Sequence, residues 1–131
     1  MQKNSIRLIL ILALLLGVIS PSAAQAPLQH TKPSTQLMAK KYAKQQLSFR
    51  GYRSSDWICL NNLWTKESHW NHKAKNKHSS AFGIAQKLNE KSKDFVTQIN
   101  NGLRYIEHRY GNPCNAWAFW QRQAKKKSGW Y

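Results

Sequence analysis

Residues 55–71, SDWICLNNLWTKESHWN, carry apolar side chains at helical spacing and a single glutamate near their end. The apolar residues recur at intervals of three and four: Trp57, Leu60, Leu63 and Trp64. This spacing predicts an amphipathic helix that runs to about Ser68. Ser55 is expected to cap its start, and Asp56 lies in the first turn, where a negative charge is favourable.

Glu67 lies on the apolar face of this predicted helix. At about 100° per residue, it stands roughly 20° from Leu60 and about 40° from Leu63 around the helix axis. An ionised carboxylate is costly to bury, so we expect the pKa of Glu67 to lie above its usual range. A protonated carboxylic acid in an apolar cleft can act as a general acid. The structural alternative is an ion pair with a buried arginine or lysine.

Carboxylates are scarce in this chain, which has 21 Lys and Arg against 5 Asp and Glu and a formal charge of +16. Four acids have simple interpretations. Asp56 and Asp94 are typical of helix starts, and Glu90 lies in a lysine-rich loop. Glu107 is expected on a helix face near Arg104 and His108. None of the four is an obvious second catalytic group. Because glycoside hydrolases ordinarily use two carboxyl groups, a lone Glu67 indicates a reaction that needs only one.

The N-terminal segment has the pattern of a secretory signal. A basic start is followed by the apolar run LILILALLLGVIS and by small residues that end at Ala26. We predict a signal peptide over residues 1–26 and export to the periplasm or the cell exterior. An uncleaved membrane anchor is the alternative, although a spanning helix needs about 20 apolar residues. A polar leader and an N-terminal helix are expected over residues 27–50, and one folded domain over residues 51–131.

The two cysteines, Cys59 and Cys114, are predicted to pair, because an exported chain folds in an oxidising compartment. In the chain-entropy model such a link contributes about 4 kcal/mol. Two free buried thiols are the alternative.

Three further helices are predicted. The first spans residues 35–47, and the second starts at Ser92 or Asp94 and ends before Gly111 and Pro113. The second carries one apolar stripe: Phe95, Ile99, Leu103, Ile106 and Tyr110. The third begins near Asn115 and runs into a basic end. Residues 70–86 are expected to form a long loop with a short helix near Ile84, and no run alternates convincingly enough to predict a strand. The fold class is therefore mainly α.

Three motifs resemble those of the lysozyme-like lytic transglycosylases, which cleave bacterial peptidoglycan. The first is Glu67 and Ser68, followed by Trp70 and Ala74; the second is SAFGIAQ at residues 80–86; the third is GLRYI at residues 102–106. The resemblance runs from about Trp57 to Tyr131. It implies a lysozyme-like single-domain fold in which Glu67 is the catalytic acid and base. It also implies that Ser68 orients Glu67 or its loop, and that Gln86 and Tyr105 line or support the sugar site.

The chain departs from the family pattern in its last motif. Where the family has Ala-Tyr-Asn, this sequence has Ala118, Phe119 and Trp120. Phe119 is therefore expected to line the substrate groove without the hydroxyl of the family's tyrosine. Gln98 also stands where asparagine is usual. Trp57 with Cys59, and residues 113–120, instead resemble a small cysteine-linked branch of the family.

The implied reaction is non-hydrolytic. Glu67 protonates the oxygen between N-acetylmuramic acid and N-acetylglucosamine, then takes a proton from the C6 hydroxyl of the same sugar, giving a 1,6-anhydro end. Two rival functions remain: a hydrolytic muramidase, and a non-catalytic cationic protein that binds cell walls or acts as an antimicrobial.

Aromatic, histidine and lysine residues suggest further contacts. Trp70, Trp117 and Trp120 are candidates for stacking on sugar rings, with core packing as the alternative. The spacing of the histidines at positions 69, 72 and 78 fits no zinc pattern, so we predict neither a metal nor a cofactor. The lysine-rich loop and residues 125–127 suit anionic envelope polymers. Nucleic acid is the rival partner, which export makes unexpected. The protein is expected to be a monomer.

Overall fold

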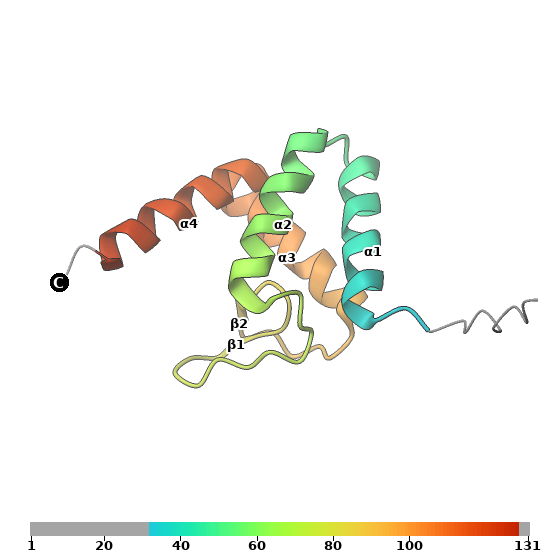
Figure 1. Ribbon diagram of the computed structural model, residues 1–131, viewed down its shortest axis with the longest axis horizontal. Helices are drawn as coiled ribbons and strands as arrows, with labels where there is room; N and C mark the ends of the chain where they lie inside the picture. Colours follow the sequence, from blue (N-terminus) through green and yellow to red (C-terminus); the bar gives the residue numbers. More distant parts are fainter. Residues whose placement is uncertain (1–31, 129–131) are drawn as a thin grey trace, which may run out of the picture. The chain divides into compact units, whose positions relative to one another are not determined.

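The computed structural model describes residues 32–128, which contain four helices and two short strands (Figure 1). The helices are α1 (Thr35–Phe49), α2 (Ser54–Ser68), α3 (Phe95–Tyr110) and α4 (Pro113–Ser128), and the strands are β1 (Ala81–Phe82) and β2 (Lys87–Leu88). The prediction of a mainly helical chain is confirmed. The predicted signal segment lies outside the described residues.

Helix α2 is packed on both sides. It contacts α4 most extensively and also meets α1, while α3 contacts both α1 and α4. The core between these helices is apolar and includes Leu47, Leu60, Trp64, Ile84, Ile99 and Leu103, each at most 2% exposed. The apolar spacing that predicted α2 therefore corresponds to its buried face. No helix within residues 32–128 is long and apolar enough to span a bilayer.

Helix α2 begins at Ser54, and its N-cap is Arg53, two residues before the predicted cap Ser55. The backbone N–H of Arg53 donates to the carboxylate of Asp56 at 3.1 Å. Ser55 is an exposed first-turn residue, so its predicted capping role is wrong. The interpretation of Asp56 as a helix-start charge is confirmed, because its carboxylate satisfies a backbone donor at the positive end of the helix.

The segment between α2 and α3 forms a hairpin where a short helix near Ile84 was predicted. β1 and β2 pair antiparallel, with Ala81 opposite Leu88 and Phe82 opposite Lys87. The helix prediction is wrong because the chain reverses at two residues in the left-handed region, Gly83 with φ 76° and Gln86 with φ 47°. Consecutive helical hydrogen bonds cannot form through such positions.

Helix α3 begins at Phe95 with Asp94 as its N-cap. The Asp94 carboxylate accepts hydrogen bonds from the backbone N–H of Thr97 at 2.8 Å and from its hydroxyl at 2.9 Å. These two bonds hold the pKa of Asp94 below its ordinary value of 3.8. Because the folded-state pKa is depressed, the stabilisation is complete above that ordinary value and is lost as the pH falls through the lower folded-state pKa.

We therefore predict that Asp94→Ala lowers the free energy of unfolding by about 1 kcal/mol near neutral pH, the usual contribution of a helix cap. Urea unfolding at neutral pH and at a pH below 3.8 measures this difference, which should shrink in acid. Thr97→Val is the matched control, because it keeps the backbone bond and should cost less. An equal loss at both pH values would contradict the capping role.

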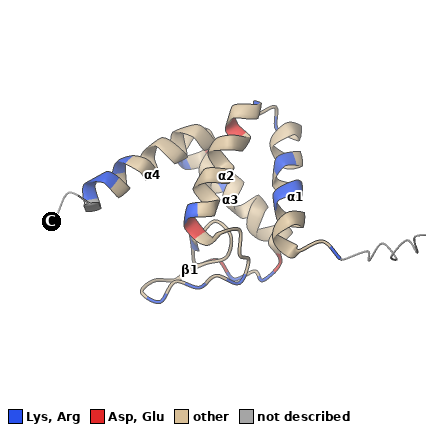
Figure 2. Cartoon of the chain, in the orientation of Figure 1, with Lys and Arg blue, Asp and Glu red and all other residues tan. Residues whose placement is uncertain are grey.

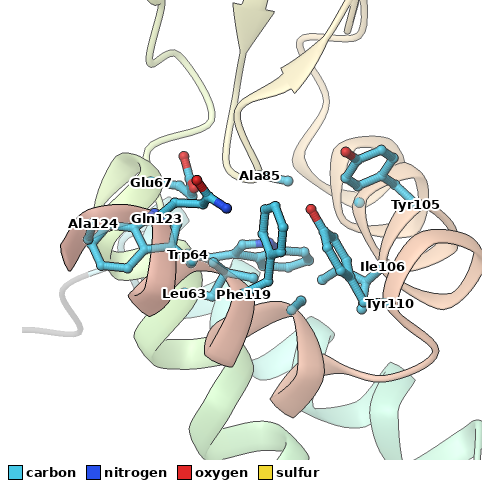
Figure 3. A pocket seen from close by; sticks show the side chains of 13 residues that line it. Leu63, Trp64, Glu67, Ala85, Tyr105, Ile106, Tyr110, Phe119, Gln123 and Ala124 are labelled. Atoms are coloured by element: carbon cyan, nitrogen blue, oxygen red, sulfur yellow. The ribbon is translucent and has the colours of Figure 1, made fainter. Parts of the chain in front are cut away.

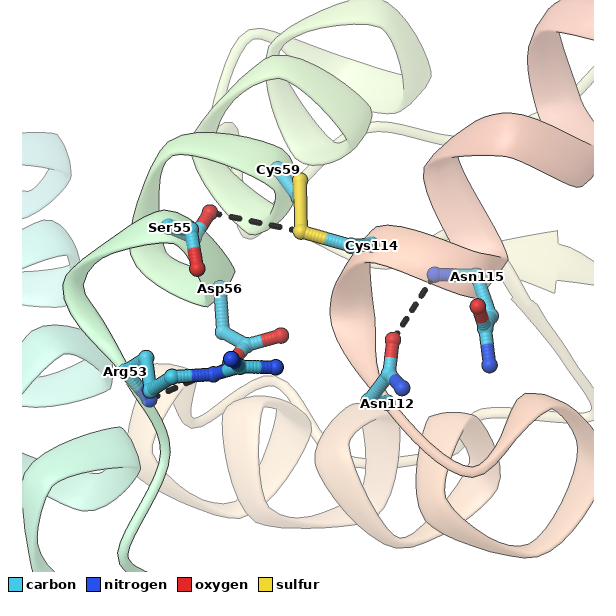
Figure 4. The surroundings of a disulfide bond; sticks show 7 residues. All are labelled: Arg53, Ser55, Asp56, Cys59, Asn112, Cys114 and Asn115. Atoms are coloured by element: carbon cyan, nitrogen blue, oxygen red, sulfur yellow. Dashed lines mark hydrogen bonds between the residues drawn. A yellow bond between two sulfur atoms is a disulfide. The ribbon is translucent and has the colours of Figure 1, made fainter.

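The link between α3 and α4 contains two residues, Gly111 and Asn112. Gly111 ends α3 with φ 81°, and the side-chain oxygen of Asn112 accepts from the backbone N–H of Asn115 at 2.8 Å. Pro113 occupies the first position of α4, where a missing N–H does no harm. Helix α4 thus starts two residues before the predicted Asn115, with Asn112 as the capping side chain (Figure 4).

The predicted disulfide between Cys59 and Cys114 is confirmed and joins α2 to the start of α4 (Figure 4). It is consistent with an exported protein.

Non-covalent contacts of Glu107 connect α3 to the end of α1. Glu107 accepts from the Arg50 guanidinium at 2.8 Å and from the Tyr52 hydroxyl at 3.4 Å. Its carboxylate is therefore paired with the end of α1, whereas the sequence suggested only its neighbours along α3.

Candidate active site

A cleft of about 420 Å³ lies between α2, α3 and α4, with the turn of the hairpin at its edge. Its lining is mostly apolar and aromatic, and includes Leu63, Trp64, Ala85, Ile106, Phe119 and Trp120. A volume of this size falls within the range of small-molecule sites. The cleft is therefore the candidate active site.

Glu67 enters the cleft from the last turn of α2, and its side chain is half-buried. Figure 3 shows Glu67 and Gln123 at one end of the cleft and Tyr105 at the other, with Phe119 between them. The helical phase that placed Glu67 on the face of Leu60 and Leu63 explains this position. Leu60 points into the core, Leu63 lines the cleft, and Glu67 follows one turn later at its rim.

Glu67 is the one carboxylate that lines this cleft, and all five acids of the chain lie in the described part. The other four accept hydrogen bonds that hold the fold: Asp56 from Arg53, Glu90 from Ser92 and Asn101, Asp94 from Thr97, and Glu107 from Arg50 and Tyr52. Each of the four thus has a structural role away from the cleft.

The floor of the cleft depends on a close approach of the Trp64 ring and Ala85 to the backbone of α3 at Gly102. A Cβ on Gly102 would lie 2.8 Å from Cζ2 of Trp64 and 2.9 Å from Cβ of Ala85. Only glycine leaves room there for the indole ring and for the hairpin turn. Gly102 therefore sets the depth of the cleft, a role that its motif position did not reveal.

Ser68 lies next to Glu67 in sequence but not in the cleft. Its hydroxyl donates to the carbonyl of Ile84 at 2.7 Å, and the side chain is buried. The bond ties the hairpin turn to the end of α2. These contacts match orientation of the loop, one of the two roles implied for Ser68, and they engage its hydroxyl inside the protein instead of in the cleft.

Gln86 also supports the loop. Its side-chain amide donates to the carbonyls of Ala74 at 3.2 Å and Gly83 at 2.9 Å, and it is absent from the cleft lining. The motif that contains Gln86 therefore reaches the cleft through Ala85. Of the two roles that the resemblance left open for Gln86, these contacts match support of the site.

Gln98 is a structural residue that sequence reasoning missed. Only 2% exposed, it accepts from the backbone N–H of Ile84 at 3.0 Å and donates to the carbonyls of His72 at 2.9 Å and Ser92 at 2.7 Å. A Cβ on Gly83 would collide with its amide group. The unusual glutamine thus holds both ends of the loop against α3.

Trp70 belongs to the core, so its prediction as a sugar-stacking residue is wrong. His69 and Trp70 adopt left-handed backbone angles, φ 53° and 61°, which fold the chain back beneath α2. The Trp70 indole is 1% exposed and packs edge-on against Trp64, with ring centroids 5.2 Å apart. Lys40 lies over its ring at 5.8 Å from the centroid.

An aromatic wall from α3 and α4 closes the far side of the cleft. The rings of Tyr105 and Tyr110 meet edge to face at 6.1 Å, and Tyr110 lies 5.3 Å from Phe119. Burial, followed by the hydrogen bond with Tyr110, raises the pKa of Tyr105, so its phenol remains protonated at neutral pH. Tyr105 and Phe119 therefore line the cleft as predicted residues of the site.

Tyr110 and Gln123 line the cleft with hydrogen-bonding side chains, and neither was predicted as a site residue. Tyr110 was assigned to the apolar stripe of its helix, yet its hydroxyl faces the cleft beside Phe119 (Figure 3). Gln123 on α4 lies in a polar stretch, and nothing else in the sequence marked it as a site residue. Tyr110 supplies a hydroxyl next to the position where Phe119 lacks one. The helical spacing of Phe119 and Gln123, four residues apart, would have placed both on one face.

The tryptophans of α4 form a stacked pair. Trp117 and Trp120 have ring centroids 5.2 Å apart and planes 17° apart. Of the two, Trp120 lines the cleft and Trp117 packs against the core. Within residues 32–128 no group of three or more His, Cys, Asp or Glu side chains is arranged to hold a metal ion.

A scan of protein-family models found no match to this chain, and searches of curated proteins and of solved structures found none either. The resemblance to lytic transglycosylases therefore rests on the three short motifs and remains a prediction.

Proposed function

We propose that this protein is a peptidoglycan lytic transglycosylase with a lysozyme-like fold, exported to the cell envelope. It cleaves glycan strands between N-acetylmuramic acid and N-acetylglucosamine without adding water. The observation that carries the proposal is Glu67, the one carboxylate at the rim of an aromatic cleft. The three motifs and their order along the chain support the same assignment.

The distribution of carboxylates favours this reaction over hydrolysis. Glycoside hydrolases ordinarily place a second carboxyl group on the opposite side of the scissile bond, at about 5–9.5 Å from the first, as a nucleophile or to activate water. Here no second acid lines the cleft, and the four others hold helix starts, a loop and an inter-helix contact. A mechanism in which one group serves twice needs no partner.

In the proposed mechanism Glu67 acts first as an acid. It transfers its proton to the glycosidic oxygen while the bond from that oxygen to C1 of the muramic acid breaks. The 2-acetamido group of this sugar helps to stabilise the positive charge at C1. The departing N-acetylglucosamine leaves with a free 4-hydroxyl, and Glu67 is now a carboxylate.

Glu67 then acts as a base. It removes the proton from the C6 hydroxyl of the muramic acid while the C6 oxygen bonds to C1, which closes the 1,6-anhydro ring and returns Glu67 to its acid form. Acid and base action by one positioned group contributes about 10²–10⁴-fold. Sugar binding and distortion must supply the remaining acceleration.

The remaining cleft residues suit the binding of a sugar strand. Tyr105, Tyr110 and Phe119 offer ring faces and edges to the apolar side of pyranose rings. The phenols of the two tyrosines can donate to sugar hydroxyls, and the amide of Gln123 can bond at the end of the cleft that holds Glu67. Because three helices surround the cleft, C1 of a bound sugar would also be shielded from water.

Analysis of the reaction products tests the proposal. Purified peptidoglycan sacculi are digested with the protein, and the released fragments are identified by mass spectrometry. We expect anhydromuramic ends, which are lighter than reducing ends by one water. Reducing ends would assign the protein as a hydrolytic muramidase. No released fragment would favour the cationic wall-binding function.

A further inference from the structure

A second cavity adjoins the candidate active site. It has a volume of about 390 Å³ and is lined by Lys87, Asn101, Arg104, Tyr105 and His108. Tyr105 lines both this cavity and the catalytic cleft, so the two share one wall. We call it the basic cavity. Its lining comes from β2 and α3, and the shared residue Tyr105 stands at the end of the cleft away from Glu67 (Figure 3).

The basic cavity is lined by cations and by no acid. Lys87 and Arg104 carry fixed positive charges, and His108 adds a protonatable ring. Figure 2 shows basic residues spread over much of the described chain and acids at few places. Excess charge alone would bind any polyanion. What sets this cavity apart is that its charges converge on a hollow next to the proposed reaction site.

Hydrogen bonds hold the Arg104 guanidinium in place. Its Nη2 donates to the side-chain oxygen of Asn101 at 2.6 Å, and the amide nitrogen of Asn101 donates to the Glu90 carboxylate at 2.9 Å. Glu90 thus contributes one negative charge behind Asn101, while Lys87 and Arg104 face the hollow. A guanidinium has five N–H donors, so an arginine held in this way can still pair with an oxyanion in a two-pronged contact.

The proposed substrate carries suitable oxyanions. Each muramic acid bears a short peptide stem whose free carboxylates project to the side of the sugar chain. A strand bound across Glu67 and Tyr105 would therefore extend its stems sideways over the neighbouring surface. We propose that the basic cavity binds a carboxylate of the peptide stem, so that the protein prefers stem-bearing strands to bare glycan. This inference rests on the proposed function.

The test compares cleavage of intact strands with strands whose stems have been removed by an amidase. Wild-type protein should cleave stem-bearing strands about 3- to 10-fold faster, as expected for one charge-assisted contact near the surface. Arg104→Gln and, separately, Lys87→Gln should reduce this ratio towards one. Arg122→Gln is the matched control, because it removes the same charge from an exposed site on α4 that lines neither cavity.

The outcomes separate the two proposals. Equal wild-type rates on both substrates, or equal effects of Arg104→Gln and Arg122→Gln on the ratio, would overturn the stem contact while cleavage itself stands. If wild-type protein cleaves neither substrate, the proposed function fails.

In that case, sedimentation with intact sacculi and with sacculi whose stems have been removed measures binding alone. Tighter binding to intact sacculi that Arg104→Gln abolishes supports the contact, and equal binding overturns it. Inorganic phosphate that competes as well as a stem tripeptide would also overturn the assignment to carboxylates.

Discussion

Glu67→Gln is expected to lower the rate of glycan cleavage by about 10²–10⁴-fold, the usual contribution of a positioned acid or base. Glutamine keeps the shape of the side chain at the rim of the cleft but can neither donate a proton to the glycosidic oxygen nor accept one from the C6 hydroxyl. Because the same group performs both steps, no other acid in the cleft can compensate. The measurement is the release of soluble fragments from purified sacculi.

Glu107→Gln provides the matched control. It removes a carboxylate of the same length from α3, where the group pairs with Arg50 outside the cleft. Glutamine keeps a side-chain oxygen that can still accept hydrogen bonds from Arg50 and Tyr52, so the control should fold normally and cleave at close to the wild-type rate. Thermal unfolding of both variants verifies that each is folded. Full cleavage by Glu67→Gln would contradict the assignment of Glu67 as the catalytic acid and base.

Removal of the disulfide should have the largest effect on stability. The double variant Cys59→Ser with Cys114→Ser is expected to lose about 4 kcal/mol in the free energy of unfolding. The bond spans a sequence separation of 55 residues, and that long loop restricts the unfolded chain strongly. A domain of this size is only marginally stable, so such a loss would unfold a large fraction of the molecules.

Urea unfolding of the oxidised wild type and of the double variant gives the difference. Wild-type protein reduced with a thiol is the control and should match the variant, because both lack the same link between α2 and α4. Since these two helices carry Glu67 and Gln123, activity should fall together with stability. A loss below about 1 kcal/mol would show that the packing of α2 against α4 holds the domain without the covalent link.

The helical part of the fold was largely predictable from the sequence. The stripe on α3 and the cap at Asp94 are local features, fixed by residues three or four apart. The position of Glu67 followed from the same periodicity, because its angle to Leu60 and Leu63 on the helix does not depend on the rest of the chain. The disulfide was predictable because the chain contains only two cysteines.

The hairpin and its supports were not predictable in this way. Its strands are two residues each, too short to show alternation. Ser68 reaches Ile84 and Gln98 reaches His72, contacts that span 16 and 26 residues. The left-handed turn at His69 carries no sequence signal, since glycine is the usual residue there. The burial of Trp70 follows from that turn, which explains why it was misassigned to the cleft.

The grouping of cleft residues from separate helices was also not predictable from periodicity. Periodicity placed Tyr110 on one face of α3, but the function of that face depends on where α4 packs. Tyr110 contacts Phe119, nine positions further along the chain and on another helix. Sequence could therefore identify the acid, whose chemistry is distinctive, more readily than the aromatic residues around it, which serve core and cleft alike.

Digestion of sacculi in water enriched in the heavy oxygen isotope tests the central claim most directly. If Glu67 alone carries the proton in both directions and the C6 oxygen closes the ring, no solvent oxygen enters the product. Mass spectrometry should then find muramic ends of the anhydro mass, without heavy oxygen. One heavy oxygen at each new muramic end would contradict the account, because water would then have attacked C1.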